Sequence, residues 1–195
     1  MPRQMRVRYS TVAIILHWTI AALVVANVLM GWQFEELSRS ERTALMQIHK
    51  ANGMTILMLT LARIAWRLVN KPPPMSQTMS FWERMAARVV HTGFYVLLLA
   101  LPLTGWITVS GHDNPGTINM FGLFQIPALG PVANLEHDLR HDVHDVTEGA
   151  HHLLGQIMVY ALIPLHILGA LKHQFLDGED ELGRMLPFRT RRPRV

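Results

Sequence analysis

The stretch at residues 152–173, HLLGQIMVYALIPLHILGALKH, constrains the fold more than any other part of the chain. Its apolar run is long enough to cross the roughly 30 Å hydrocarbon core of a bilayer, yet it contains histidines. His152 and His166 lie fourteen residues apart, which on an α-helix is about 21 Å along the axis. Fourteen steps of about 100° return to nearly the same direction, so both rings are expected on one helix side, near opposite membrane faces.

The composition also indicates a membrane protein. Of the 195 residues, 50% are hydrophobic and 16% are charged, whereas about 25% are charged in a typical soluble domain. The chain has no cysteine, which excludes disulfides, iron–sulfur clusters, thiolate zinc sites and covalently attached c-type haem. The eleven histidines are therefore the main supply of metal ligands.

We interpret residues 1–195 as a single membrane domain with four apolar spans. The spans are expected at approximately 12–32, 45–68, 89–109 and 152–173. The first span resembles a secretory signal peptide, but it is too long, and bulky Trp32 and Phe34 follow it instead of a cleavage site. A loop at 110–150 and a basic tail at 177–195 complete the chain. Because helices satisfy their own backbone in lipid, the fold class expected is an all-α, four-transmembrane-helix bundle.

Basic residues predict the orientation, because Lys and Arg gather on the cytoplasmic side of membrane proteins. With the N-terminus inside, fourteen of the 18 basic residues lie in the cytoplasm, and both termini do too. The inner group is Arg3, Arg6, Arg8, Arg63, Arg67, Lys71, Arg84, Arg88, Lys172, Arg184, Arg189, Arg191, Arg192 and Arg194. The outer group is Arg39, Arg42, Lys50 and Arg140. The net charge of +4 is therefore a topology signal, and no nucleic-acid partner is expected.

Four histidines fall at two depths of this bundle. His17 and His166 lie towards the cytoplasm, whereas His49 and His152 begin their spans from outside. Facing histidines suit the two axial positions of a haem iron, so two such layers would stack two haems. A single histidine of this kind is more often a hydrogen-bonded side chain, but ionisable groups inside spans are costly, and four that pair by depth favour ligation.

Small side chains near these histidines leave room for a flat macrocycle. They are Ala13 and Ala21 beside His17, Gly53 after His49, Gly155 after His152, and Gly169 and Ala170 after His166. Small residues also serve helix packing in membranes. His91 is instead followed by Phe94 and Tyr95, so it is not expected to be a ligand.

Four motifs resemble the bacterial cytochrome b561 family: ILHW at 15–18, MQIHKANG at 46–53, HTGFY with ALPLTGW at 91–106, and HILGALKHQF followed by RMLP. The resemblance covers nearly the whole chain. It implies a multi-pass protein of the bacterial inner membrane with two non-covalent haem b groups, held by His17 with His166 and by His49 with His152. It also implies electron transfer between ubiquinone and an outer partner, either superoxide, as in superoxide oxidase, or a periplasmic redox protein.

The chain departs from the family where the fourth span begins. The family commonly has His followed by Glu there, whereas here His151 and His152 are adjacent and Leu153 takes the place of the Glu. The fourteen-residue spacing favours His152 as the ligand. His151 is the alternative, rotated by about 100° on an α-helix.

Other polar residues are secondary candidates. Lys50, Arg63 and Arg67 either neutralise haem propionates or extend to lipid headgroups, and Lys172 and His173 would border a quinone site.

A second His-rich segment lies in the loop at 110–150. It holds His137, Asp138, His141, Asp142, His144 and Asp145. If helical, it offers a divalent-metal site, although a solvated acidic helix is the commoner meaning of such a pattern. Two further functions remain open: a subunit of a larger dehydrogenase or hydrogenase complex, and a divalent-metal transporter. The acidic character of this loop argues against superoxide as the substrate.

Overall fold

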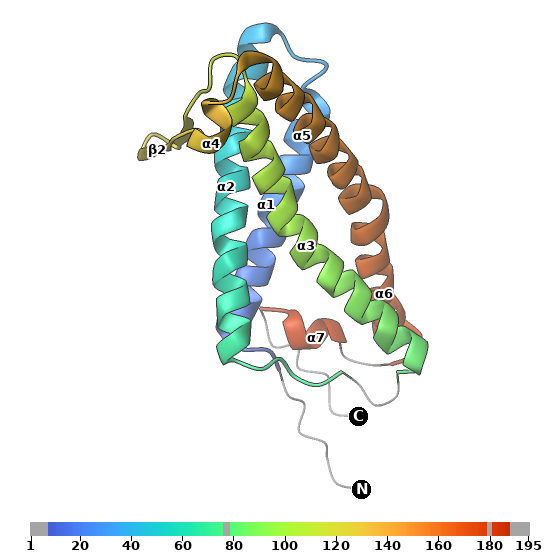
Figure 1. Ribbon diagram of the computed structural model, residues 1–195. Coiled ribbons are helices and arrows are strands. Elements are labelled where there is room, and N and C mark those ends of the chain that lie inside the picture. Colours follow the sequence, from blue (N-terminus) through green and yellow to red (C-terminus); the bar gives the residue numbers. More distant parts are fainter. Residues whose placement is uncertain (1–7, 76–78, 179–180, 188–195) are drawn as a thin grey trace, which may run out of the picture.

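The structure, a computed structural model, describes residues 8–75, 79–178 and 181–187. Arg3, Arg6 and the arginines from Arg189 onward lie outside the described residues. The described chain is mostly helical, with four long helical segments side by side and a small hairpin at one end (Figure 1). The long segments are α1 (Thr11–Gln33), α2 (Arg39–Val69), α3 (Phe81–Gly111) and the continuous run of α5 (His137–Ile157), the π-helical turn η1 (Met158–Leu162) and α6 (Ile163–Phe175). The short elements are β1 (Ile118–Met120), β2 (Phe124–Ile126), α4 (Gly130–Ala133) and α7 (Glu181–Met185).

Three of these segments are long and apolar enough to cross a membrane, counted over the described residues. They are α1, α3 and the run from α5 to α6. Helix α2 has 31 residues, but Asn52, Arg63 and Arg67 lower its hydropathy. Three of the four expected spans are therefore supported by length and composition, and α2 is supported by length alone.

Helix α3 begins earlier than its expected span because local capping starts it there. The Ser80 side chain accepts a hydrogen bond from the Glu83 backbone N–H at 3.3 Å, and the Glu83 carboxylate accepts one from the Ser80 N–H at 2.7 Å. This capping box satisfies two donors that a helix start would otherwise leave unpaired. Residues 81–88, which precede the expected span at 89–109, thus form one helix with it.

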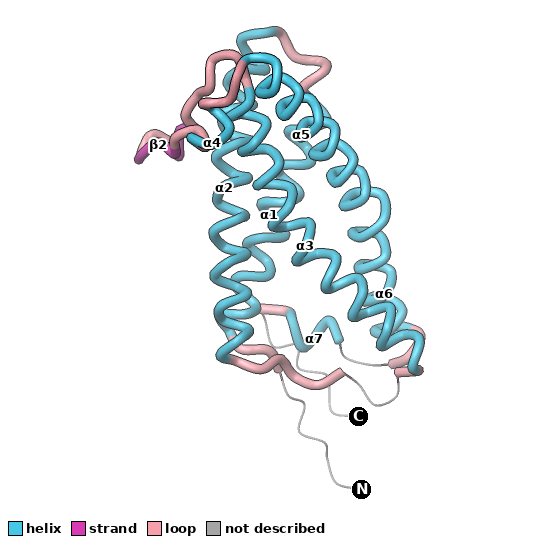
Figure 2. Tube along the Cα trace, in the orientation of Figure 1, coloured by secondary structure: helices cyan, strands magenta, loops and turns pink. Residues whose placement is uncertain are grey.

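The helices pack in chain order, and the two ends of the described chain meet. The most extensive contacts are those of α1 with α2, α2 with α3, and α3 with α5 (Figure 2). Beneath them, Tyr9 N–H donates to the Arg184 carbonyl at 3.4 Å, and the Trp18 indole N–H donates to the Met185 carbonyl at 2.8 Å. Part of the predicted basic tail is therefore the short helix α7, folded against the start of α1.

The connection at 110–150 is more structured than the sequence indicated. Helix α5 already begins at His137, and β1 pairs antiparallel with β2 in the register Ile118 with Ile126. Ile118 and Met120 are buried against α2, in a cluster with Ala51, Met54 and Leu57. The His-rich segment is therefore helical, and the hairpin is fixed to the side of α2.

A polar network joins α1 to α2 inside the apolar region. The Asn52 side-chain amide donates to the Leu23 carbonyl at 3.0 Å and to the Asn27 side-chain oxygen at 2.7 Å. Asn27 in turn donates to the His49 carbonyl at 3.3 Å. These bonds fix the rotation of α2 relative to α1, and thereby the position of His49.

Replacing Asn52 tests this network. We expect Asn52→Ala to lower the free energy of unfolding by about 0.6–1.7 kcal/mol, the range for interhelical hydrogen bonds in membranes. Thermal unfolding in detergent, followed by circular dichroism, measures the change. Asn114→Ala, at an exposed loop position, is the control and should leave the midpoint in place. Equal midpoints for the two variants would show that the network does not stabilise the fold.

Candidate functional site

Two pairs of histidine rings face each other at two levels of the molecule. At the level nearer the described chain ends, His17 of α1 faces His166 of α6, with ring centroids 6.1 Å apart and ring planes at 73°. At the other level, His49 of α2 faces His151 of α5, at 6.2 Å and 73°. The chain thus builds the same arrangement twice.

The spacing of the rings fits a metal ion held between them. A metal–imidazole bond is about 2 Å and the ring centre lies about 1 Å behind the nitrogen, so two ligands on opposite sides of one metal have centres about 6 Å apart. Both pairs match this distance. The buried Nδ1 of His49 also has no hydrogen-bond partner among the described residues, a costly state for a polar atom in an apolar region. The ring of His49 therefore has bonding capacity that the described protein groups leave unused.

The structure brings His151, and not His152, to His49. His152 is exposed, whereas His151 is half-buried. The His151 Nδ1 lies 3.0 Å from the Leu101 carbonyl oxygen and 3.2 Å from the Thr104 hydroxyl. Since a carbonyl only accepts, Nδ1 carries the proton and Nε2 keeps its lone pair, the arrangement usual for metal-ligating histidines.

The π-helical turn explains why His151 faces inward. The predicted fourteen-residue spacing assumed an unbroken α-helix, and that assumption is wrong, because the Ile163 N–H donates to the carbonyl of Met158, five residues back. A π turn takes in one extra residue. His151 and His166 are fifteen residues apart. Because the π turn takes in one of these residues, the two side chains lie on the same side of the helix, as residues fourteen apart would in an unbroken α-helix. Pro164, which lacks an N–H and disturbs the preceding turn, was the sequence signal for this change.

Glycines leave space beside three of the four rings. A Cβ at Gly155 or at Gly169 would have no neighbour within 4 Å, and one at Gly53 would meet only the Asn27 amide at 3.6 Å. Gly105 has the opposite role, since a Cβ there would lie 3.2 Å from Cε1 of the His151 ring. The first three glycines leave room for a flat group beside the rings. Gly105 leaves room for the His151 ring itself.

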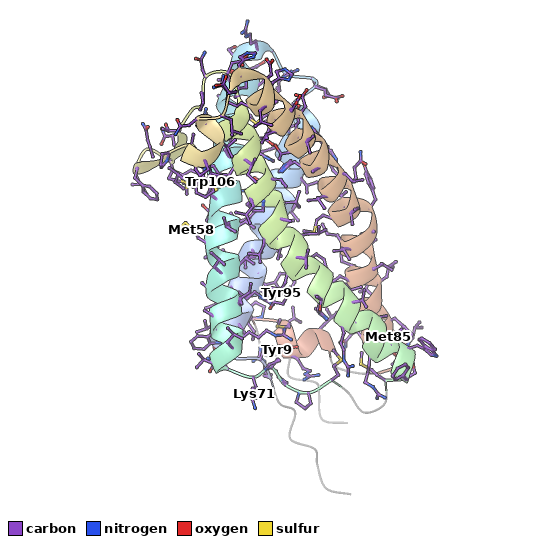
Figure 3. The ribbon with its side chains drawn as sticks, in the orientation of Figure 1. Tyr9, Met58, Lys71, Met85, Tyr95 and Trp106 are labelled. Atoms are coloured by element: carbon purple, nitrogen blue, oxygen red, sulfur yellow. The ribbon has the colours of Figure 1, made fainter. Side chains whose placement is uncertain are left out.

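Cationic residues accompany the pair of His17 and His166. The Arg63 guanidinium donates to the Ala13 carbonyl at 3.1 Å and to the Tyr95 hydroxyl at 3.4 Å. Arg67 lies 5.6 Å from the centre of the ring of Tyr95, the residue that Figure 3 labels. Both side chains therefore contact protein groups at the level of His17 and His166.

At the other level, Lys50 is half-buried next to His49 and lines a shallow hollow with Arg42. These two residues belong to the basic group expected outside.

The two candidate quinone neighbours, Lys172 and His173, are held by carboxylates. Lys172 Nζ lies 2.5 Å from Glu83 Oε1 and 2.7 Å from Asp177 Oδ2, and His173 Nδ1 lies 2.7 Å from the same Asp177 oxygen. Hydrogen bonds from Lys172 and then His173 hold the pKa of Asp177 below its usual value. This network joins the start of α3 to the end of α6.

The His-rich segment groups its side chains differently from the sequence-based expectation. Among the described residues, His144, Asp145 and Glu148 have ligand atoms within 4.8 Å of one another. His137 instead pairs with Asp113 at 3.4 Å. Glu148 was not expected in such a group, although it follows His144 by one helical turn.

His91, which was not expected to be a ligand, lies next to the pair of His17 and His166. Its Nδ1 lies 2.7 Å from the Ala87 carbonyl of its own helix, and its ring is exposed, 5.5 Å from the ring of His166.

Apolar helices that pair histidines at two depths define a class of protein, the membrane cytochromes. The family model described as prokaryotic cytochrome b561 matches residues 8–188, and the chain belongs to this family. Cytochrome b561 homolog 2 of Escherichia coli (strain K12) is 30% identical over 181 residues, 92% of this chain and 91% of the relative. The probable superoxide oxidase CybB of Yersinia pestis is 30% identical over 187 residues, 94% and 98% of the two chains. Cytochrome b562 of Cereibacter sphaeroides is 27% identical over 184 residues, 91% and 94%.

The chain is therefore a membrane cytochrome that transfers electrons, and its family implies that it binds b-type haem. The facing rings, the unused bonding capacity of His49 and the space beside the glycines all fit such a group.

Gly105→Ala tests whether His151 belongs to this site. The added methyl would press on the ring at 3.2 Å, so we expect the variant to bind less haem than the unchanged protein, up to the loss of one equivalent. Haem per protein, measured by the pyridine haemochrome method, gives the result. Gly149→Ala, two residues before His151 and with open space around the added Cβ, is the matched control. Full haem content with an unchanged spectrum in Gly105→Ala would argue against His151.

Proposed function

We propose that this cytochrome is a four-helix bundle in the bacterial inner membrane, with α2 as the fourth crossing helix and both termini in the cytoplasm. At about 1.5 Å per residue, the 31 residues of α2 extend about 46 Å, enough for a bilayer. Arg63 and Arg67 near its end would reach the inner headgroups. The excess of basic residues expected at this end supports the orientation.

Two haem b groups are proposed, one at each level. His17 and His166 would hold the inner haem, and His49 and His151 the outer one. The equal centroid distances of the two pairs carry this proposal. Arg63 and Arg67 would face the propionates of the inner haem, and Lys50 those of the outer haem.

The proposed activity is electron transfer between an outer donor or acceptor and ubiquinone. The two histidines of each pair would hold a haem, which would supply one-electron transfer when bound. The chain's own residues hold the ligands and set their distance. Lys172 and His173, with Asp177, would border the quinone and hold a proton near it.

Superoxide is the proposed outer donor. The name of the Yersinia pestis relative supports this choice, and so does the hollow on α2 that Arg42 and Lys50 line. A small anion would be attracted to these two cations despite the acidic start of α5. This activity would make the protein a superoxide:ubiquinone oxidoreductase.

Stopped-flow mixing tests the activity. We expect superoxide to reduce the haem spectrum of the purified protein and a ubiquinone analogue to reoxidise it. Lys50→Gln should slow the first step several-fold and weaken its salt dependence, because it removes one steering charge, while Lys71→Gln at the opposite end should not. Reduction by a dehydrogenase complex but not by superoxide would instead indicate a subunit of such a complex.

Single histidine replacements test the ligand assignment. We expect His151→Ala to lose one haem and His152→Ala to retain both, because only His151 faces His49. His91→Ala should also retain both. Haem stoichiometry and the reduced-minus-oxidised spectrum measure the outcome. Loss of a haem from His152→Ala, with none lost from His151→Ala, would reverse the assignment.

A further inference from the structure

We propose that the β1–β2 hairpin with its flanks, residues 117–127, is a lipid anchor that lies in the outer headgroup layer beside α2. This inference rests on the proposed membrane bundle, and in particular on α2 crossing the bilayer. It adds a contact with lipid that the haem pairs and the electron route do not require.

The composition of the segment separates it from its neighbours. From Asn114 to Leu135 the chain contains no Asp, Glu, Lys, Arg or His, whereas His112 and Asp113 precede it and Glu136 follows it. An uncharged stretch of this length is unusual for a loop in water. It is well suited to the membrane interface, where apolar and uncharged polar groups are both accommodated.

The hairpin lies at the depth of the outer histidine pair. Ile118 and Met120 are only 2% and 4% exposed because they pack on α2, in a cluster that reaches Leu57. At the tip, Phe121 and Gly122 line a hollow with Ile48 of α2, the residue before His49. A hydrogen bond from the Trp106 indole to the Pro127 carbonyl, 3.1 Å long, fixes the second strand to α3 (Figure 3). The hairpin therefore lies against the outer part of the proposed span and does not project into the solvent beyond it.

Apolar side chains at the tip of the hairpin and next to it are uncovered. Phe121 is 57% exposed, Leu123 82% and Phe124 53%. The exposed apolar surface continues on α2, where Ile48 lines a hollow with Phe121. Ile48 and Met58, of which Figure 3 labels Met58, are about half exposed. Since the α2 surface would face lipid, the adjoining hairpin surface has the same neighbour.

The turn at the tip supports an interfacial role for its aromatic residue. Phe121 and Gly122 have φ of 54° and 81°, and Leu123 N–H donates to the Met120 carbonyl at 3.0 Å, as in a type I′ turn. Asn or Gly is favoured at the first central position, and a bulky residue is strained there. Phe121 is 57% exposed, so more than half of its surface gains no contact with the protein in return. Contact with lipid accounts for an aromatic side chain at this position.

Backbone chemistry limits the depth to the headgroup layer. A hairpin of two strands leaves N–H and C=O groups unpaired along its free edge, and the hydrocarbon core offers them no partner. Water among the headgroups does.

Spin labelling tests the proposal directly, because the chain has no cysteine of its own. Leu123→Cys, labelled with a nitroxide in phosphatidylcholine–phosphatidylglycerol vesicles, should collide more with oxygen than with a water-soluble nickel complex. Val25→Cys on α1 is the lipid reference, and Asp142→Cys on α5 is the water reference. We expect an oxygen-to-nickel ratio at Leu123 at least threefold above that at Asp142. Adding Phe121→Asn, which suits the turn, should shift the ratio towards water while the haem spectrum stays the same.

Two results at Leu123 would overturn the anchor. A ratio equal to that at Asp142 would place the tip in water, and exclusion of both reagents would place it against protein, either a second copy or another chain. If Val25 reads as lipid in these cases, the proposed membrane bundle stands and only the anchor fails. If Val25 also reads as water, the bundle itself is wrong.

Discussion

The facing of two histidine rings across the protein, at about 6 Å in each of two levels, is the constraint on which the rest of the structure depends. Within the described chain, the extensive helix contacts follow chain order. The ring pairs instead relate α1 to α6 and α2 to α5. At the level of His49 and His151, polar bonds from neighbouring helices position both residues: Asn27 donates to the His49 backbone carbonyl, and Leu101 and Thr104 contact the His151 ring. In an apolar environment such bonds have few competitors, so they fix helix rotation as well as position.

Depth along the membrane could be predicted from the sequence, whereas rotation about a helix axis could not be predicted fully. Depth depends only on counting residues from the ends of apolar runs, and this was enough to pair His17 with His166 and to place His49 at the other level. The direction of a side chain about the helix axis depends on every residue before it, so one π turn changes this direction by about 100°. The choice between His151 and His152 depended on that single turn.

The structure of the connection between the third and fourth spans also could not be predicted from the sequence. Its helical half, from His137, is polar, and its hairpin is uncharged but too short to show a strand pattern, so hydropathy detects neither. Contacts with α2 fix the hairpin, through Ile118 and Met120. With His151 facing His49, Gly155 follows His151 by four residues, as Gly53 follows His49. His152 then takes the place where the family commonly has Glu.

A single helical run carries one histidine of each pair, and this has a consequence for electron transfer. His151 and His166 are separated by about 20 Å along the axis, and their separation is set by the helix and not by packing between helices. A π turn changes the rotation between the two levels far more than their separation. The distance between the two proposed haem levels is therefore insensitive to loops and termini, while their orientation depends on the turn that Pro164 favours. Substitutions at the surface would therefore leave this distance intact.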